Sequence, residues 1–282
     1  MKIVRIGDPG QERPALLENG RLRDLGGVIA DVAGAALLPE GLAKLRALAP
    51  DTLPLIDGSP RIGPCIGSVG KVICVGLNYR DHAVEANMPI PSEPILFLKP
   101  TSAIIGPNDD VEIPVGAEKT DWEVELGVVI GKPGKYVPVE RALDHVAGYC
   151  VVNDVSERSY QLERGGTWDK GKGCDTFAPV GPWLVTRDEV PEPQALDLWL
   201  EVDGERMQTG NTRTMIFDVS HLVSYISRFM SLRTGDVIAT GTPPGVGMGH
   251  KPPRYLKVEQ TVRLGISGLG IQTQRMVAAT YL

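Results

Sequence analysis

The sequence predicts a β-rich α+β fold, in which a small N-terminal α/β domain (residues 1–69) precedes a larger domain (residues 70–282). The chain has 33 glycines and 23 prolines among 282 residues, spread without a repeat. This pattern indicates many tight turns between short strands. With 42% hydrophobic and 23% charged residues, the chain can bury a sizeable core.

Composition also argues against several classes of function. A net charge of −6 disfavours nucleic acid or an anionic membrane as the main partner. Asp31 interrupts the most apolar stretch, residues 28–38, and the N-terminus resembles no signal peptide. The four cysteines lack CxxC spacing, which is typical of reduced thiols in a cytoplasmic protein and disfavours zinc.

The N-terminal residues carry structural signals but no group of chemically active side chains. We expect a strand over residues 1–6 and a hairpin over 15–22 that turns on Asn19-Gly20. Leucines spaced by three residues after Pro39 predict a short helix. Residues 57–60, Asp-Gly-Ser-Pro, resemble a linker.

The stretch over residues 119–129 places two carboxylates side by side. As a strand, it points Val124, Leu126 and Val128 to one face and Glu123, Glu125 and Gly127 to the other. If the carboxylates are buried, a hard divalent cation is their natural partner. The alternative is a half-solvated strand whose polar face meets water.

A strand over residues 71–76 and a helix over 77–87 place His82 and Glu85 on one face. A carboxylate beside an imidazole orients the ring and favours its charged form, as a general base requires. The alternative is an exposed ion pair that contributes little. Prolines at 89, 91 and 94 end the helix in a loop.

A further strand, residues 147–153, ends at Asp154. This carboxylate can reach a site at the rim of the sheet, or it can cap a helix that begins at residue 155. Arg158 and Gln161 share a face of that helix, and the guanidinium suits a substrate carboxylate.

The second half of the chain adds two glycine-rich loops. The loop over residues 165–177 contains Lys170 and Lys172, which can approach a ligand. The loop over 241–249 follows a strand (236–240) and is a candidate anion cradle, although it lacks a nucleotide-binding motif. Between them we expect a hairpin on Asp203-Gly204 and a helix with a regular apolar stripe (219–230), whose His221 is structural. The last two strands span 258–266 and 271–275.

In this order the motifs resemble the fumarylacetoacetate hydrolase family over residues 70–282. The segments that carry the resemblance are 76–79 with His82 and Glu85, 121–126, 153–156 with Arg158 and Gln161, 172–177, and 240–247. The resemblance implies a mixed β-sandwich roll and a homodimer. Glu157 stands where the family often has Ala or Pro.

The resemblance also implies roles for individual residues. Glu123, Glu125 and Asp154 match the metal ligands, for Mg²⁺ or Mn²⁺. His82 and Glu85 match the general-base pair, and Lys172 matches the active-site lysine. Arg158, Gln161 and Thr242 match positions that contact the substrate, Thr242 being preferred over Thr240.

The implied reaction is metal-dependent hydrolysis of a carbon–carbon bond in a 2,4-diketo acid of acylpyruvate type, which releases pyruvate. Segments 165–172 and 248–257 resemble hydrolases of 2,4-diketo-3-deoxy-L-fuconate or rhamnonate, sequences also labelled ureidoglycolate lyase. Oxaloacetate decarboxylation and ureidoglycolate lysis on the same metal are alternatives. A metal-binding scaffold without activity is a third.

Overall fold

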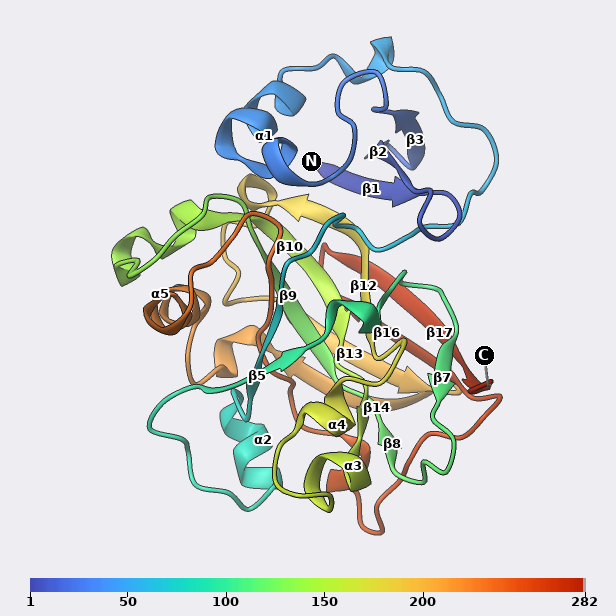
Figure 1. Ribbon diagram of the computed structural model, residues 1–282, viewed down its shortest axis with the longest axis vertical. Coiled ribbons are helices and arrows are strands. Elements are labelled where there is room, and N and C mark those ends of the chain that lie inside the picture. The colour runs from blue at the N-terminus through green and yellow to red at the C-terminus, as the bar shows by residue number, and fades with distance from the viewer. Residues whose placement is uncertain (281–282) are drawn as a thin grey trace.

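The computed structural model describes residues 1–280 and has the strand-rich α+β architecture that the sequence predicts (Figure 1). Its largest sheet has ten strands. Nine of them follow the order β3–β2–β1–β12–β10–β9–β15–β4–β5, and the tenth, β6, pairs with β12. The strands of this sheet are β1 (Lys2–Ile6), β2 (Arg13–Glu18), β3 (Arg21–Asp24), β4 (Val72–Gly76), β5 (Ile95–Lys99), β6 (Ile104–Ile105), β9 (Val124–Ile130), β10 (Val146–Asn153), β12 (Ala178–Thr186) and β15 (Val237–Ala239).

A second sheet of five strands follows the order β14–β13–β16–β17–β7. Hydrophobic side chains from both sheets and from the helix α5 form the main core. The strands are β7 (Val111–Ile113), β13 (Asp197–Val202), β14 (Glu205–Asn211), β16 (Thr261–Ile266) and β17 (Gly270–Ala278), and the short pair β8 (Thr120–Asp121) and β11 (Ser156–Glu157) stands apart from both sheets.

The helices are short, apart from α5. They are α1 (Pro39–Arg46), α2 (Arg80–Glu85), α3 (Arg158–Leu162), α4 (Asp169–Lys172) and α5 (Val219–Phe229). Short 3₁₀ helices lie at Gly34–Leu37, Pro50–Thr52, Thr101–Ala103, Val139–His145, Arg187–Glu189, Thr212–Thr214 and Gly247–Gly249. In Figure 1, α2, α3 and α4 lie at the bottom, at the opposite end from the N-terminal strands.

Strand β9 has two different faces, and both are buried. Val124, Leu126 and Val128 point into the main core, as the alternation predicts. On the other face, Glu125 is followed by Gly127 and then by Val129, which belongs to a second core. The alternative of a half-solvated strand is therefore wrong, because every residue of β9 is shielded from water.

The antiparallel pairing of β10 with β9 places the third carboxylate beside the other two. Asn153, the last residue of β10, pairs with Val124. The next residue, Asp154, donates its backbone N–H to the carbonyl of Glu123 at 2.9 Å. This register brings together the carboxylates of Glu123 and Asp154, which are 31 positions apart in the sequence.

The N-terminal residues form a lobe at the top of Figure 1, yet their strands continue the large sheet. Strand β1 pairs with β12, where Ile3 lies opposite Leu184. The second core combines residues from both sides of position 69, for example Leu42 and Ile66 with Val152 and Val180. The sheet is therefore continuous across the boundary that the sequence predicts.

The local predictions differ from the structure in two helices. The helix predicted over 77–87 spans only Arg80–Glu85, because Leu77 has φ +51° and Tyr79 is extended. Residues 156–157 form a strand rather than the first turn of a helix, and α3 begins only at Arg158. The cap of α3 is the side chain of Glu157, which accepts from the N–H of Ser159. The capping role considered for Asp154 is therefore wrong, and its carboxylate is free for the site. By contrast, the hairpin turning on Asn19-Gly20 and the helix α5 form as predicted.

His221 stays outside the site, as predicted. Its ring stacks between Phe217 and Tyr225 on the surface of α5. None of the helices within residues 1–280 is long and apolar enough to cross a membrane.

Candidate metal centre and active site

Three buried carboxylates converge where β9 begins. Glu123, Glu125 and Asp154 each offer an oxygen within 4.8 Å of the oxygens of the other two. Glu123 lies just before β9, Glu125 within it, and Asp154 just after β10. The structure therefore brings together the three residues that the sequence predicts as metal ligands.

Glu123 is held by two cations. Arg158 Nη2 lies 2.6 Å from Glu123 Oε1, and Lys172 Nζ lies 2.8 Å from Oε2. Burial by itself would raise the pKa of Glu123, but the two positive charges outweigh it and lower this pKa to about 2. Glu123 is therefore a permanent anion.

Glu125 has the opposite environment. Its Oε2 accepts one backbone N–H, from Gly241 at 2.8 Å, and within residues 1–280 it forms no ion pair. Burial, together with the nearby charges of Asp154 and Glu123, raises the pKa of Glu125 well above its usual range. A cation at this position would remove that penalty.

Asp154 contacts a lysine that the sequence analysis missed. Lys99, the last residue of β5, places Nζ 2.5 Å from Asp154 Oδ1 and 2.9 Å from the carbonyl of Val155. The Lys99 side chain is fully buried. In the sequence, Lys99 continues the alternation of Ile95 and Phe97, so it shares their face of β5, and this was the available signal.

Arg158 does not present a free fork to a substrate. Its Nε donates to Asp121 at 2.8 Å, and its Nη1 donates to Gln161 Oε1 at 3.0 Å, in addition to the pair with Glu123. The bidentate role predicted for Arg158 would therefore require these partners to give way. Gln161 keeps its amide N–H groups for the pocket, because only its oxygen is used.

The loop after β15 binds the protein's own carboxylates with its backbone N–H groups. Gly241 donates to Glu125, Gly245 donates to Glu85, and Gly247 donates to Asp121. Gly241 has φ +96°, and a Cβ there would lie 2.7 Å from the Cβ of Asn78, so only glycine fits. The predicted anion cradle is real, but its anions are side chains of this chain and not an external ligand.

His82 and Glu85 form the predicted pair on α2. His82 Nδ1 lies 3.0 Å from Glu85 Oε2, and Gly245 N–H donates to Glu85 Oε1 at 2.9 Å. Burial opposes the charge of Glu85, but these hydrogen bonds outweigh it and lower its pKa. The charged carboxylate fixes the ring and leaves Nε2 of His82 free for chemistry.

Lys172 bridges two of the carboxylates. Its Nζ lies 2.8 Å from both Glu123 Oε2 and Asp154 Oδ2, and the side chain is buried. Burial would lower its pKa, but the two carboxylates raise the pKa of Lys172 to about 12. Lys172 is therefore a fixed positive charge and not a base. Lys170, in contrast, is exposed and donates to the carbonyl of Arg164.

Thr242 lines the pocket, but its hydroxyl is already engaged. It donates to the carbonyl of Val124 at 2.9 Å and accepts from Gln208 Nε2 at 2.8 Å. It can therefore offer a substrate only a remaining lone pair. Gln208, a buried residue of β14, was also missed, because an isolated glutamine in a hairpin gives no signal in the sequence.

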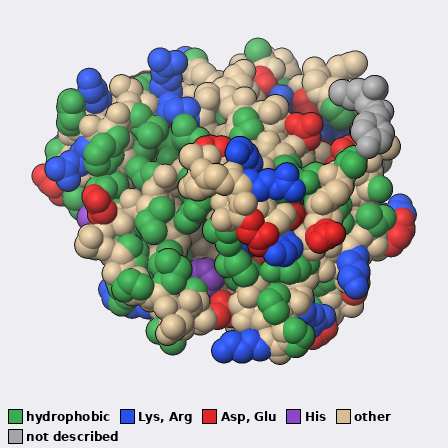
Figure 2. Space-filling view, turned by 60° about the horizontal axis from the view of Figure 1, so that its bottom comes forward, with side chains coloured by type: hydrophobic (Ala, Val, Ile, Leu, Met, Phe, Trp, Pro, Cys, Tyr) green, Lys and Arg blue, Asp and Glu red, His purple; other side chains and the backbone are tan. Residues whose placement is uncertain are grey.

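These groups surround one pocket of about 210 Å³. Figure 2 shows a hollow on the face seen from below, with hydrophobic side chains around it and a histidine visible inside. The predicted residues that line the pocket are His82, Glu123, Glu125, Arg158, Gln161, Lys172 and Thr242. Glu85 and Asp154 support it through their contacts with His82 and Lys172.

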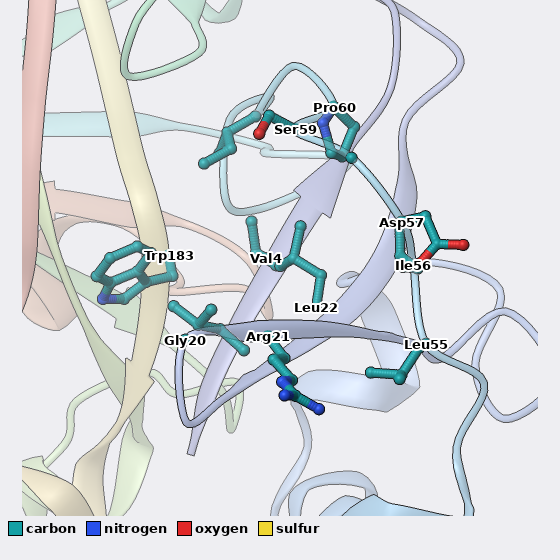
Figure 3. A pocket seen from close by; sticks show the side chains of 13 residues that line it. Val4, Gly20, Arg21, Leu22, Leu55, Ile56, Asp57, Ser59, Pro60 and Trp183 are labelled. Atoms are coloured by element: carbon teal, nitrogen blue, oxygen red, sulfur yellow. The ribbon is translucent and has the colours of Figure 1, made fainter.

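A larger cavity, of about 580 Å³, lies between the N-terminal strands and β12. Figure 3 shows Val4 and Leu22 across from Trp183, with Leu55, Ile56 and their neighbours along the other side. Arg21 and Asp57 are the charged residues in its lining, and the cavity is separate from the three carboxylates. It offers no set of groups suited to catalysis, so we place the functional site at the smaller pocket.

The donor set fits a hard divalent cation. Carboxylate oxygens are the ligands that Mg²⁺ and Mn²⁺ prefer. Glu125 is the residue that requires such a partner, since it is buried next to two other carboxylates without an ion pair of its own within residues 1–280. Glu123, Glu125 and Asp154 would therefore hold the metal.

Comparison with known proteins agrees with this site. Residues 71–277 match the family model described as fumarylacetoacetate (FAA) hydrolase C-terminal. A protein of Burkholderia multivorans, named "Putative hydrolase", is 66% identical over 281 residues, which cover 99% of this chain and 100% of that protein.

Two solved structures resemble the whole chain. The 2-hydroxyhepta-2,4-diene-1,7-dioate isomerase from Mycobacterium marinum is 34% identical with a TM-score of 0.78, over 100% of each chain. The maleylpyruvate hydrolase from Sphingobium sp. SYK-6, solved with a manganese(II) ion and pyruvate, is 28% identical with a TM-score of 0.83, over 99% of this chain and 100% of that one. This chain belongs to the fumarylacetoacetate hydrolase family.

Proposed function

We propose that this protein hydrolyses the bond between C3 and C4 of a 2,4-diketo acid of acylpyruvate type and releases pyruvate. One observation carries the proposal: three buried carboxylates converge within 4.8 Å at a pocket that also contains a His82–Glu85 pair. The similar maleylpyruvate hydrolase, with its bound manganese and pyruvate, supports it.

A Mg²⁺ or Mn²⁺ ion held by Glu123, Glu125 and Asp154 would polarise the 2-keto and carboxylate oxygens of the substrate and stabilise the charge that develops on cleavage. The chain's own residues supply the rest. Lys172 has two of its three N–H groups on carboxylates, which leaves one for a substrate oxygen.

His82 is placed to move the proton. Its Nε2 takes a proton from water, whose hydroxide adds to C4, while Glu85 stabilises the imidazolium. The bond between C3 and C4 then breaks, and its electron pair remains on C3. The proton on His82 returns to C3, which completes pyruvate, and the acyl group leaves as a carboxylic acid. Water is consumed and the atoms balance.

The experiment that tests this proposal measures pyruvate release from acetylpyruvate after chelation and after addition of Mn²⁺ or Mg²⁺. We expect turnover only with the metal, and a loss of about 10²–10⁴-fold in kcat for His82→Ala. His221→Ala, which removes a histidine outside the site, is the matched control.

Undiminished hydrolysis by His82→Ala would refute the role of His82 as the residue that activates water. Oxaloacetate decarboxylation needs no activated water, so it would survive that substitution. Ureidoglycolate lysis is checked by release of urea and glyoxylate. An isomerase, as in the Mycobacterium marinum protein, would convert its substrate without releasing pyruvate. A scaffold would bind the metal without any turnover. The preference for 2,4-diketo-3-deoxy-L-fuconate or rhamnonate stays a prediction, as does the homodimer.

A further inference from the structure

The pocket changes character away from the carboxylates. Beyond the polar groups named above, its lining is apolar and comes from several separate segments of the chain. We call this part the distal pocket; its main residues are Leu77, Met88, Ile95, Phe97, Trp168 and Met248. If the pyruvyl end of the substrate lies at the carboxylates, its acyl group meets this apolar lining.

The aromatic side chains fix the shape of the distal pocket. Lys172 Nζ lies 5.0 Å from the centre of the Phe97 ring, and Phe97 meets Trp168 edge to face at 5.2 Å. A Cβ on Gly76 would lie 2.6 Å from the Trp168 ring, so the indole lies directly against the backbone of β4. Trp168 thus closes the space next to the lysine.

The pocket is also small. Its volume of about 210 Å³ lies below the roughly 300–1,000 Å³ that is typical of ligand pockets. The pyruvyl part of the substrate takes up a share of this space. A short acyl group fits the remainder.

Among the residues that the structure describes, the distal pocket has no cation for a second carboxylate. The basic residues of the whole lining are His82, Arg158 and Lys172; Arg158 and Lys172 are paired with Glu123, and His82 is paired with Glu85. A dicarboxylic substrate would therefore bury its distal carboxylate without a positive partner, which is strongly unfavourable.

The distal pocket also offers few hydrogen-bond partners for the hydroxyl groups of a substrate. The hydroxyl of Thr242 is engaged, and His82 is required for water, so Gln161 is the free polar partner in the lining. The acyl group of a sugar diketo acid carries several hydroxyls. Each one left without a partner costs roughly tenfold in affinity.

Apolar residues continue to the mouth of the pocket. Met88, Leu162 and Met248 come from three segments, line the pocket and are 52%, 50% and 37% exposed. Exposed apolar side chains that gather at one opening are typical of a site that receives an apolar group. Figure 2 shows such side chains around the hollow.

We infer that the acyl group of the substrate is short, uncharged and apolar, and that Trp168, Ile95 and Met88 determine this preference. The inference rests on the proposed function. It assigns a different substrate class from the sugar acids that the sequence resemblance implies, and from the dioate named for the similar isomerase.

The test compares kcat/KM for three substrates with the Mn²⁺-loaded protein: butanoylpyruvate, maleylpyruvate and 2,4-diketo-3-deoxy-L-fuconate. We expect butanoylpyruvate to exceed each of the others by at least tenfold. Equal or faster turnover of either polar substrate would overturn the inference and leave the proposed hydrolysis intact.

A pair of arginine variants tests the distal pocket itself. Met88→Arg places a cation in the lining at an exposed position, so it should raise the ratio of maleylpyruvate to butanoylpyruvate turnover by at least tenfold. Val84→Arg is the matched control, because Val84 is 79% exposed and lies outside the lining. An equal change in both variants would mean that charge near the mouth acts at long range, against the inference.

A binding measurement separates the inference from the reaction. Calorimetry with 2-oxohexanoate and 2-oxoadipate, which lack the bond to be hydrolysed, compares an apolar with a charged tail. Tighter binding of 2-oxohexanoate by at least tenfold, without turnover of any diketo acid, would support the distal pocket and refute the proposed function. Tighter binding of 2-oxoadipate would overturn the inference.

Discussion

The three carboxylates of the site have unequal partners. Glu123 is paired with Arg158 and Lys172, and Asp154 is paired with two lysines, whereas within residues 1–280 Glu125 receives only a backbone N–H. In the metal-free protein, the charge of Glu125 is therefore the least compensated. We therefore propose that this single residue links metal binding to stability.

Substituting Glu125 tests that link. Glu125→Gln removes a carboxyl whose ionised form is disfavoured by burial and by its neighbours, so without metal it should raise the free energy of unfolding by about 1 kcal/mol at pH 7. Wild type should gain about 2.7 kcal/mol from Mn²⁺ at a hundredfold excess over Kd, and the variant should gain none. Urea unfolding with and without chelator measures both quantities, and Glu118→Gln, an exposed change nearby, is the control.

The stability of the wild type and that of Glu125→Gln should also depend differently on pH. The folded state raises the pKa of Glu125, so it binds the proton more tightly than the unfolded chain does. Stability of the metal-free wild type therefore falls as pH rises above the unfolded value, about 4.3, and the fall is smaller in Glu125→Gln. Parallel pH profiles would contradict the assignment.

At the residue scale, the sequence predicted the carboxylates and the His82–Glu85 pair, but not the cations that hold them. Lys99 meets Asp154 although β9, β15 and β4 lie between β5 and β10 in the sheet. Asp121 continues the alternation of Glu123 and Glu125, yet its partner Arg158 is 37 positions away. Such pairs depend on the strand order, which a single sequence does not contain.

At the element scale, β9 joins the site to the second core. Gly127 lies opposite Cys150, and a Cβ at Gly127 would lie 2.7 Å from Cys150 Sγ and 2.8 Å from Val152 Cγ2. The sequence indicates only that Gly127 shares the face of Glu125. In the structure, this glycine lets β10 pack against β9 directly beside the three carboxylates.

Adding one methyl group there tests the packing. Gly127→Ala forces a buried overlap between central strands, so it should lower the free energy of unfolding by about 1–3 kcal/mol. Gly27→Ala is the matched control, since a Cβ there has no neighbour within 4 Å, and it should change stability by less than about 0.5 kcal/mol. Urea unfolding at a constant m-value provides the measurement, and equal stability of the two variants would refute the argument.

Strands β12 and β5 are not predicted from the sequence, because prolines lie in or next to them. Strand β12 contains Pro179 and Pro182, which argue against a central strand, yet β12 lies between β1 and β10. Strand β5 follows a proline-rich loop, and no element is predicted for its residues. Helix α5 and the hairpins were predicted correctly, because their periodicity and turn residues are local signals.

At the scale of the whole molecule, one sheet unites the two predicted domains. The second core takes Ile3, Leu16 and Leu45 from the N-terminal residues, and Cys150 and Val152 from β10. The boundary at residue 69 therefore separates two stretches of the chain that share one core. We propose that these two stretches are not independently stable.

Truncation tests this proposal. Removing residues 1–69 would expose one edge of β12 and one face of β9 and β10, so residues 70–282 alone should show no cooperative unfolding in urea, followed by circular dichroism. The full chain under the same conditions is the control. A cooperative transition of the fragment, at the urea concentration of the full chain, would show that the predicted domain folds alone.

The sequence by itself determined the strand-rich fold, the family and the identity of the three carboxylates and the histidine pair, because periodicity, turn residues and ordered motifs are local. The tertiary structure decided which charges those groups meet: it pairs Arg158 with Asp121, directs the glycine loop to internal carboxylates, and surrounds the distal pocket with apolar residues. Each of these depends on strand order and register, which bring distant residues within hydrogen-bonding distance.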